Sequence, residues 1–152
     1  SRLTTYVSLC LSQEYWDEVN PKHVTFFEHG IVGQSVGHAH LHIFPVSLNI
    51  GANARQDFPT SELEVLRDIE TLPHRWANRS SPYLLWSTSG FGPTLCWNPA
   101  APRQYFRTIS AHLLGYPSRA DWKTMDPLLD KRMWEGTVER LKKRLERVPF
   151  KS

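Results

Sequence analysis

Three histidines at alternate positions, His38, His40 and His42, are the feature that most constrains how this chain folds. Successive side chains of an extended strand point to opposite faces, so the three imidazoles share one face and the apolar residues between them share the other. A row of imidazoles is poor material for an apolar core, because each ring carries polar nitrogen atoms that need partners. The pattern therefore predicts a strand over residues 35–44 whose histidine face lines a polar site. A solvated strand that merely exposes its histidines is the plainer alternative.

Two kinds of chemistry fit such a row. Neutral imidazole is a common metal ligand, and Glu28 and His29 on the preceding strand would be available to complete a metal shell. In the other chemistry the middle imidazole attacks phosphorus while its neighbours hold the phosphate. Gln34 and Ser35, just after Gly33, favour the second kind because a flexible backbone, an amide and a hydroxyl suit phosphate oxygens.

Residues 33–45, with three histidines separated by single apolar residues and two further apolar residues after the last, resemble the signature of the histidine-triad (HIT) family of nucleotide hydrolases and transferases. The resemblance implies an enzyme that cleaves the α-phosphate linkage of a dinucleoside polyphosphate or a nucleotide conjugate through a nucleotidyl-histidine intermediate. It implies no cofactor and no obligatory metal, a nucleotide as substrate, and a homodimer as an open expectation.

The resemblance also implies roles for individual residues. His40 would be the nucleophile, and His42 and Ser35 would contact the α-phosphate and the departing oxygen. His38 would orient and polarise the site, and Gln34 would contact the phosphates. Glu28 stands where the family usually carries an amide, so its carboxylate would repel a polyphosphate unless it meets a ribose hydroxyl or is itself neutralised.

The resemblance predicts an α+β fold in which residues 1–50 form the C-terminal half of a HIT-like domain with an antiparallel sheet. The half that would hold the base and ribose is expected either upstream of Ser1 or in a partner. Residues 51–152 are expected to form a C-terminal extension of a hairpin and helices. Three rival functions stay open. The first is a metal-dependent hydrolase that uses the three histidines as ligands, and the second is a HIT-like protein that binds nucleotides without turning them over. Binding through the last helix is a third.

Periodicity and turn residues predict the elements. Strands are expected over residues 23–29 and 35–44 as an antiparallel pair, and over 83–87 and 94–97 as a hairpin. Helices are expected over residues 3–19, 61–72, 103–114 and 127–148, the second from the capping-box spacing of Ser61 and Glu64 and the third ending at Gly115. Residues 46–60 are expected to be irregular.

Composition limits the remaining possibilities. No run of about 20 apolar residues is present, so no membrane span is expected, and two cysteines among 152 residues predict a cytoplasmic protein without a disulfide framework. The net charge is +3, and residues 131–152 hold eight Lys or Arg against three Glu, so the rest of the chain carries −2. The basic character thus belongs to the last helix, where a solvated face explains it, and nucleic acid is not an expected partner.

Several other residues have an open or structural interpretation. His29 has either a place in the site or a structural role. Arginines 103, 107 and 119 are expected to be solvated rather than to contact phosphate. The tryptophans of the C-terminal part are expected to build its core: Trp86, Trp97, Trp122 and Trp134.

Overall fold

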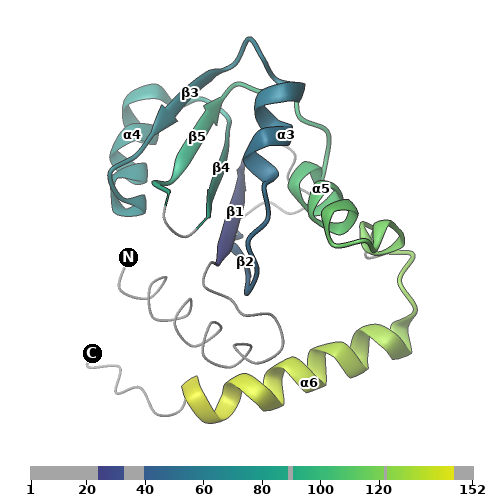
Figure 1. Ribbon diagram of the computed structural model, residues 1–152. Coiled ribbons are helices and arrows are strands. Elements are labelled where there is room, and N and C mark those ends of the chain that lie inside the picture. Colours follow the sequence, from purple (N-terminus) through teal and green to yellow (C-terminus); the bar gives the residue numbers. More distant parts are fainter. Residues whose placement is uncertain (1–23, 33–39, 89–90, 122, 146–152) are drawn as a thin grey trace.

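The computed structural model of the chain describes residues 24–32, 40–88, 91–121 and 123–145 (Figure 1). These residues form an α+β fold with one five-stranded antiparallel sheet, in the strand order β2-β1-β4-β5-β3. The strands are β1 (Thr25–Gly30), β2 (His42–Phe44), β3 (Glu62–Val65), β4 (Tyr83–Thr88) and β5 (Thr94–Trp97). The helices are α3 (Ile50–Asp57), α4 (Leu72–Arg79), α5 (Tyr105–Leu113) and α6 (Pro127–Leu145).

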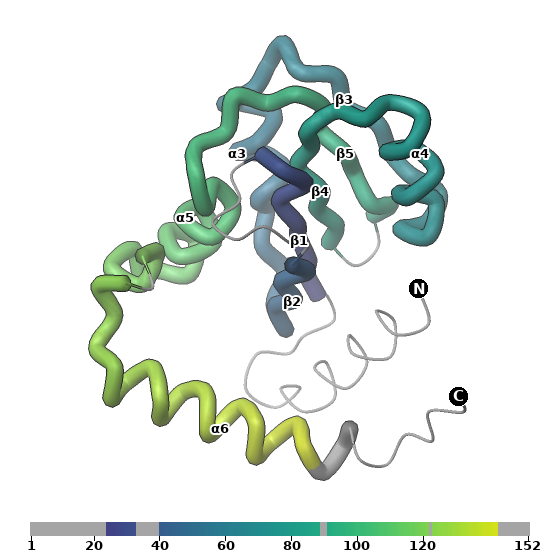
Figure 2. The backbone as a smooth tube through the Cα atoms, turned by 180° about the vertical axis from the view of Figure 1, so that it is seen from behind, coloured from purple at the N-terminus to yellow at the C-terminus, as the bar shows by residue number. Residues whose placement is uncertain are grey.

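The central strands bury side chains on both faces of the sheet. On one face Phe27, Leu84 and Trp86 pack against Ile50 of α3 and Phe106 of α5. The other face carries a second cluster, in which residues of β4 and β5 meet the segment before α4: Leu66, Tyr83, Leu85, Leu95 and Trp97. Figure 2 shows α3 and α5 beside β1 and β4, with α4 at the far side near β3. Successive side chains of β4 point to opposite faces of the sheet, so Leu84 and Trp86 enter the first cluster and Tyr83 and Leu85 enter the second.

The sheet confirms the antiparallel pair and the hairpin. Thr25 of β1 pairs with Phe44 of β2, and Tyr83 of β4 pairs with Trp97 of β5. The β1 strand also pairs with β4 along its whole length. Strands from both sides of the boundary expected at residue 50 therefore belong to the same sheet. The helix predicted over residues 3–19, and residues 35–39 of the second strand, lie outside the described residues.

Two predictions about the segment between β2 and β4 are wrong. Residues 46–60 are not irregular, since α3 occupies Ile50–Asp57 and buries Ile50 and Ala54 completely. Residues 61–72 do not form a helix, because Glu62–Val65 pair with β5 as an edge strand. The spacing of Ser61 and Glu64 is that of a capping box, yet the exposed backbone of β5 offers this segment a better set of hydrogen bonds.

The two C-terminal helices differ in how they are held. Helix α5 ends in a Schellman motif, with Gly115 at φ 78° and the Tyr116 N–H donating to the Ala111 carbonyl at 2.8 Å, so its predicted C-terminus is confirmed. Helix α6 extends away from the sheet (Figure 1), and Trp134 is 63% exposed. The prediction that Trp134 belongs to the core is therefore wrong, whereas Trp86 and Trp97 are buried as predicted. None of the described helices is both long and apolar enough to span a membrane.

Candidate active site

The histidine row lies at the β2 edge of the sheet. His42 is the first residue of β2 and pairs with Phe27 of β1, whereas His40 precedes the strand and is exposed. The two rings lie 6.3 Å apart between centroids, at 36° to each other. The strand predicted over residues 35–44 is therefore confirmed only from His42, and His38, Gln34 and Ser35 lie outside the described residues.

His42 is half-buried and held against an aromatic wall. Its ring stacks on Phe27, with centroids 4.6 Å apart and planes at 22°. Burial lowers the pKa of His42 below the usual 6.5, and the nearby charges of His40 and Arg107 lower it further. The His42 imidazole is therefore neutral at pH 7, with one N–H donor and one acceptor nitrogen.

His29 is buried and lies beside His42. It lies on β1, two residues after Phe27, and its ring centroid is 6.4 Å from that of His42. The backbone N–H of Phe106 donates to His29 Nε2 at 3.1 Å. Burial, followed by the charge of His42, lowers the pKa of His29 to about 4. A neutral ring that accepts through Nε2 carries its proton on Nδ1, so the tautomer of His29 is fixed.

Glu28 faces the opposite side of β1 from His29. It is buried, and the Tyr83 hydroxyl donates to Glu28 Oε1 at 3.3 Å. Burial raises the pKa of the Glu28 carboxyl, while the bond from Tyr83 and the charge of His40 act in the opposite direction. Burial also raises the pKa of the Tyr83 hydroxyl. The charge of His40 also lowers the pKa of His42, on the other face of the sheet.

The end of β1 is tightly packed around the Tyr83 ring. A Cβ atom at Gly30 would lie 2.2 Å from carbon atoms of that ring, so only glycine allows Tyr83 to reach Glu28. Ile31 follows with φ 76°, an unusual value for a β-branched residue. Strained backbone of this kind is held in place by its surroundings and is often found beside functional groups.

Arg107 of α5 is not simply solvated, contrary to the prediction. It is half-buried, its Nε donates to the Ala120 carbonyl at 2.9 Å, and its charge lowers the pKa of His42. The bond from Nε leaves the two terminal amino groups as further donors of this side chain. Arg119 instead stacks on Tyr116, with its guanidinium carbon 4.4 Å from the ring centroid. Nothing in the spacing of the three arginines distinguishes Arg107, because its place depends on how α5 packs.

Metal binding has no complete ligand set in the part of the chain that the structure describes, where no three His, Cys, Asp or Glu side chains are grouped around a common point. His38, a ligand in the metal hypothesis, lies outside that part. His29 uses Nε2 to accept from Phe106, which leaves only its protonated Nδ1. The arrangement is better suited to polar contact with an anion, since Arg107 and the imidazole N–H groups are donors.

Of the predicted site residues, the structure describes Glu28, His40 and His42. His42 lies with His29 on one face of the sheet, whereas Glu28 lies with Tyr83 on the other. His29 lies one residue after Glu28, which is a usable signal, whereas Tyr83 and Arg107 come from distant segments. No family model, curated protein or solved structure matches the chain.

Proposed function

We propose that the protein is a histidine-triad type nucleotide hydrolase or nucleotidyltransferase. Its substrate would be a dinucleoside polyphosphate or a nucleotide conjugate, cleaved at the α-phosphate through an adduct on His40. The observation that carries the proposal is the pair formed by an exposed His40 ring and a half-buried, neutral His42 ring 6.3 Å away. The resemblance of residues 33–45 to the histidine-triad signature supports the same assignment.

In the first step, a ring nitrogen of His40 forms a bond to the α-phosphorus, and the bond from phosphorus to the leaving oxygen breaks. The nucleoside monophosphate is then held as a phosphoramidate. In the second step, water attacks the same phosphorus, the phosphorus–nitrogen bond breaks and the nucleotide is released. Splitting the reaction in this way replaces one difficult displacement with two easier ones.

The neighbouring groups have defined parts in this scheme. His42 donates its N–H to the phosphate or the leaving oxygen, and its neutrality avoids a second fixed positive charge beside His40. The terminal amino groups of Arg107 stabilise the charge that develops on the phosphate oxygens. His29 keeps its ring orientation through the Phe106 N–H and so supports His42 from the buried side.

Glu28 is compatible with a nucleotide because its pKa is raised by burial. A carboxyl group that holds its proton more tightly repels a polyphosphate less than an ordinary carboxylate. Its bond from Tyr83 fixes one oxygen and leaves the other for a ribose hydroxyl.

The decisive experiment replaces His40 with Asn and measures the release of nucleoside monophosphate from diadenosine polyphosphates and from an adenosine phosphoramidate. We expect turnover to be lost while the circular dichroism spectrum and melting temperature are unchanged, because His40 is exposed. His74→Asn is the matched control, since His74 is exposed on α4, near the opposite edge of the sheet. Mass spectrometry of the rapidly quenched wild-type protein should find a nucleotidyl adduct on His40.

Undiminished turnover in His40→Asn would remove the proposal. Activity that disappears with a chelator and returns with a divalent metal would instead favour the metal-dependent hydrolase. Nucleotide-induced stabilisation without an adduct or product would favour a binding protein.

A further inference from the structure

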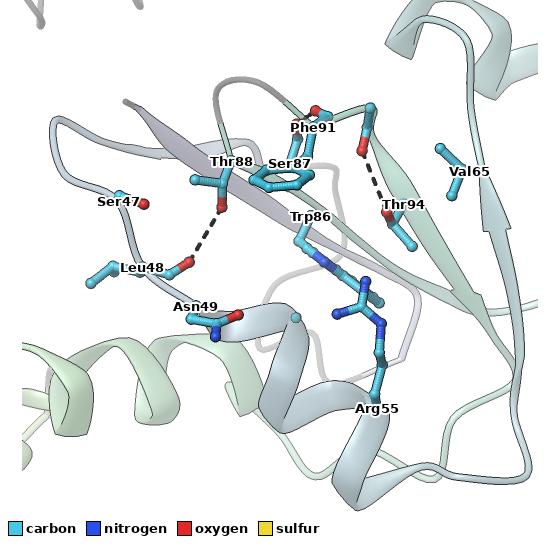
Figure 3. A pocket seen from close by; sticks show the side chains of 12 residues that line it. Ser47, Leu48, Asn49, Arg55, Val65, Trp86, Ser87, Thr88, Phe91 and Thr94 are labelled. Atoms are coloured by element: carbon cyan, nitrogen blue, oxygen red, sulfur yellow. Dashed lines mark hydrogen bonds between the residues drawn. The ribbon is translucent and has the colours of Figure 1, made fainter. Parts of the chain in front are cut away.

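A cavity lies among α3, β4 and β5, on the face of the sheet that α3 covers (Figure 3). It has a volume of about 460 Å³, and its lining includes Asn49, Arg55, Trp86, Thr88, Phe91 and Thr94. None of the described residues of the histidine site lines it. Thr88 lies at the end of β4 that pairs with Thr25, whereas Tyr83, which contacts Glu28, lies at the other end. A cavity of this volume is large enough for a small organic ligand.

Arg55 is the only charged side chain among the described residues that line the cavity, and no Asp or Glu is among them. Its guanidinium carbon lies 5.9 Å from the centroid of the Trp86 ring. Within the described ranges Arg55 forms no ion pair with a carboxylate. A guanidinium that lines a cavity without an acidic partner favours a ligand with an anionic group, and its planar fork matches the two oxygens of a carboxylate.

Trp86 offers a second donor at the same place. A Cβ atom at Gly51 would lie 2.3 Å from the indole nitrogen, so the glycine lets the indole edge approach the first turn of α3. Among the residues that the structure describes, no acceptor receives a hydrogen bond from this N–H. The indole N–H and the guanidinium are therefore both available to a ligand on the α3 side of the cavity.

Three hydroxyl groups that line the cavity donate their protons to backbone carbonyls. Thr88 Oγ1 donates to the Leu48 carbonyl at 3.3 Å, Ser87 Oγ donates to the Phe91 carbonyl at 2.9 Å, and Thr94 Oγ1 donates to the Gly92 carbonyl at 3.4 Å. These oxygens present lone pairs rather than donors. Because Arg55 is the single cation of the described lining, the cavity balances the one charge of a carboxylate better than the two charges of a phosphate dianion.

The apolar part of the wall is aromatic. Phe91 follows β4 and is 77% exposed, an unusual state for a large apolar side chain beside a cavity, and Trp86 lies at the base of the same wall (Figure 3). Aromatic side chains at a site of this kind pack well against a flat ring. We propose that this cavity binds a small aromatic carboxylic acid, with its carboxylate on Arg55 and the Trp86 indole N–H and its ring against Phe91.

The test uses ¹⁵N-labelled protein, in which the indole resonance of Trp86 is identified by its loss in Trp86→Phe. Benzoate is titrated as the probe, with phenol and phenyl phosphate as comparison ligands of similar ring size. We expect benzoate to shift the Trp86 indole resonance saturably and phenol to bind more weakly. Arg55→Gln should weaken benzoate binding on the order of tenfold, the effect of losing a hydrogen bond to a charged group.

Arg132→Gln is the matched control, because Arg132 is exposed on α6 away from the cavity. It should leave the affinity unchanged, as should His40→Asn, since His40 does not line the cavity. Phe91→Ala should weaken benzoate and phenol alike. The proposal is overturned if benzoate does not move the Trp86 resonance, or if Arg55→Gln binds benzoate as tightly as the wild type. Tighter binding of phenyl phosphate than of benzoate would overturn the assignment of the anion as a carboxylate.

Discussion

The two edges of the sheet both carry titratable side chains, but for different reasons. At the β2 edge the pKa of His42 is lowered mainly because burial disfavours the charged ring. At the β3 edge the pKa of Glu62 is lowered mainly because Arg79 donates hydrogen bonds to its carboxylate. Both pKa values are lowered, but the consequences differ. The environment of His42 favours the neutral imidazole, whereas the environment of Glu62 favours the charged carboxylate. Only the first prepares a side chain for chemistry at neutral pH.

The partners at each edge extend this difference. Arg79 holds both oxygens of Glu62 at 2.7 and 2.9 Å, and Arg75 holds Glu64 at 3.0 Å, so β3 is fastened to α4 by ion pairs. His42 is held by stacking on Phe27, next to Phe44. Both edge strands are short, which limits pairing with other chains. We therefore interpret the β3 edge as structural and the β2 edge as functional, and the following predictions test that division.

The largest contrast is expected in activity. His42→Asn should lower the turnover of the proposed nucleotide reaction by about 100-fold or more, because an amide cannot transfer a proton to the leaving oxygen as an imidazole can. Glu62→Gln, at the other edge, should change turnover by less than about twofold, because an exposed ion pair contributes little. The measurement is the initial rate with a diadenosine polyphosphate. Equal losses in the two variants would show that the edges do not differ in function.

The second contrast is in pH dependence. The unfolded chain takes up a proton on His29 as the pH falls below 6.5, whereas the folded protein does so only at about pH 4. The contribution of His29 to stability is thus complete above pH 6.5 and is lost between pH 6.5 and 4, which corresponds to about 3 kcal/mol at most. The raised pKa of Glu28 acts in the opposite sense, because its contribution falls as the pH rises.

Urea unfolding of the wild type and of His29→Gln, measured between pH 4 and 8, separates these two effects. The glutamine keeps an acceptor for the Phe106 N–H and does not titrate, while Glu28 is common to both proteins. We expect the free energy of unfolding of His29→Gln to fall less on acidification than that of the wild type. Parallel pH profiles would show that His29 is not held neutral.

The third effect concerns the packing that links the sheet centre to the β2 edge. Gly30→Ala should destabilise the protein by about 1–3 kcal/mol, because the new Cβ would overlap the Tyr83 ring and push its hydroxyl from Glu28. Gly136→Ala, on α6 with nothing within 4 Å of its Cβ position, should be neutral or stabilising by up to about 1 kcal/mol. Chemical denaturation of both variants measures the difference. A stable Gly30→Ala protein would mean that Tyr83 can move freely.

Local patterns in the sequence predict the parts of the fold that local forces determine. The β1 strand, the hairpin of β4 and β5, and the Gly115 terminus of α5 follow from alternation and turn residues. The α3 and β3 assignments fail because tertiary contacts decide them. In α3, glycine and asparagine are weak helix formers, but burial of Ile50 and Ala54 compensates. In β3, pairing with β5 outweighs a helical capping pattern.

The candidate site divides in the same way. The alternation of His38, His40 and His42 is by itself enough to indicate a polar row, and Glu28 follows from its place on the neighbouring strand. Tyr83 and Arg107 enter the site through strand register and helix packing over more than 50 residues of sequence, which no local pattern encodes. The lowered pKa of His29 similarly depends on the backbone of α5.

The smallest expected effect is at the β3 edge. Arg79→Gln removes two hydrogen bonds to Glu62 and a guanidinium that lies 4.7 Å from the centroid of the Trp97 ring. Because the Glu62 side chain is 61% exposed, solvent and salt screen the pair. We therefore expect the melting temperature to fall by no more than about 3 °C at low salt, and by less in 1 M NaCl. The Arg79→Lys variant keeps the positive charge but not the pair of hydrogen bonds. Its melting temperature should lie between those of the wild type and Arg79→Gln. A large fall in melting temperature that 1 M NaCl does not reduce would mean that packing on Trp97 holds α4 at this edge. The ion pair with Glu62 would then not be what stabilises the β3 edge.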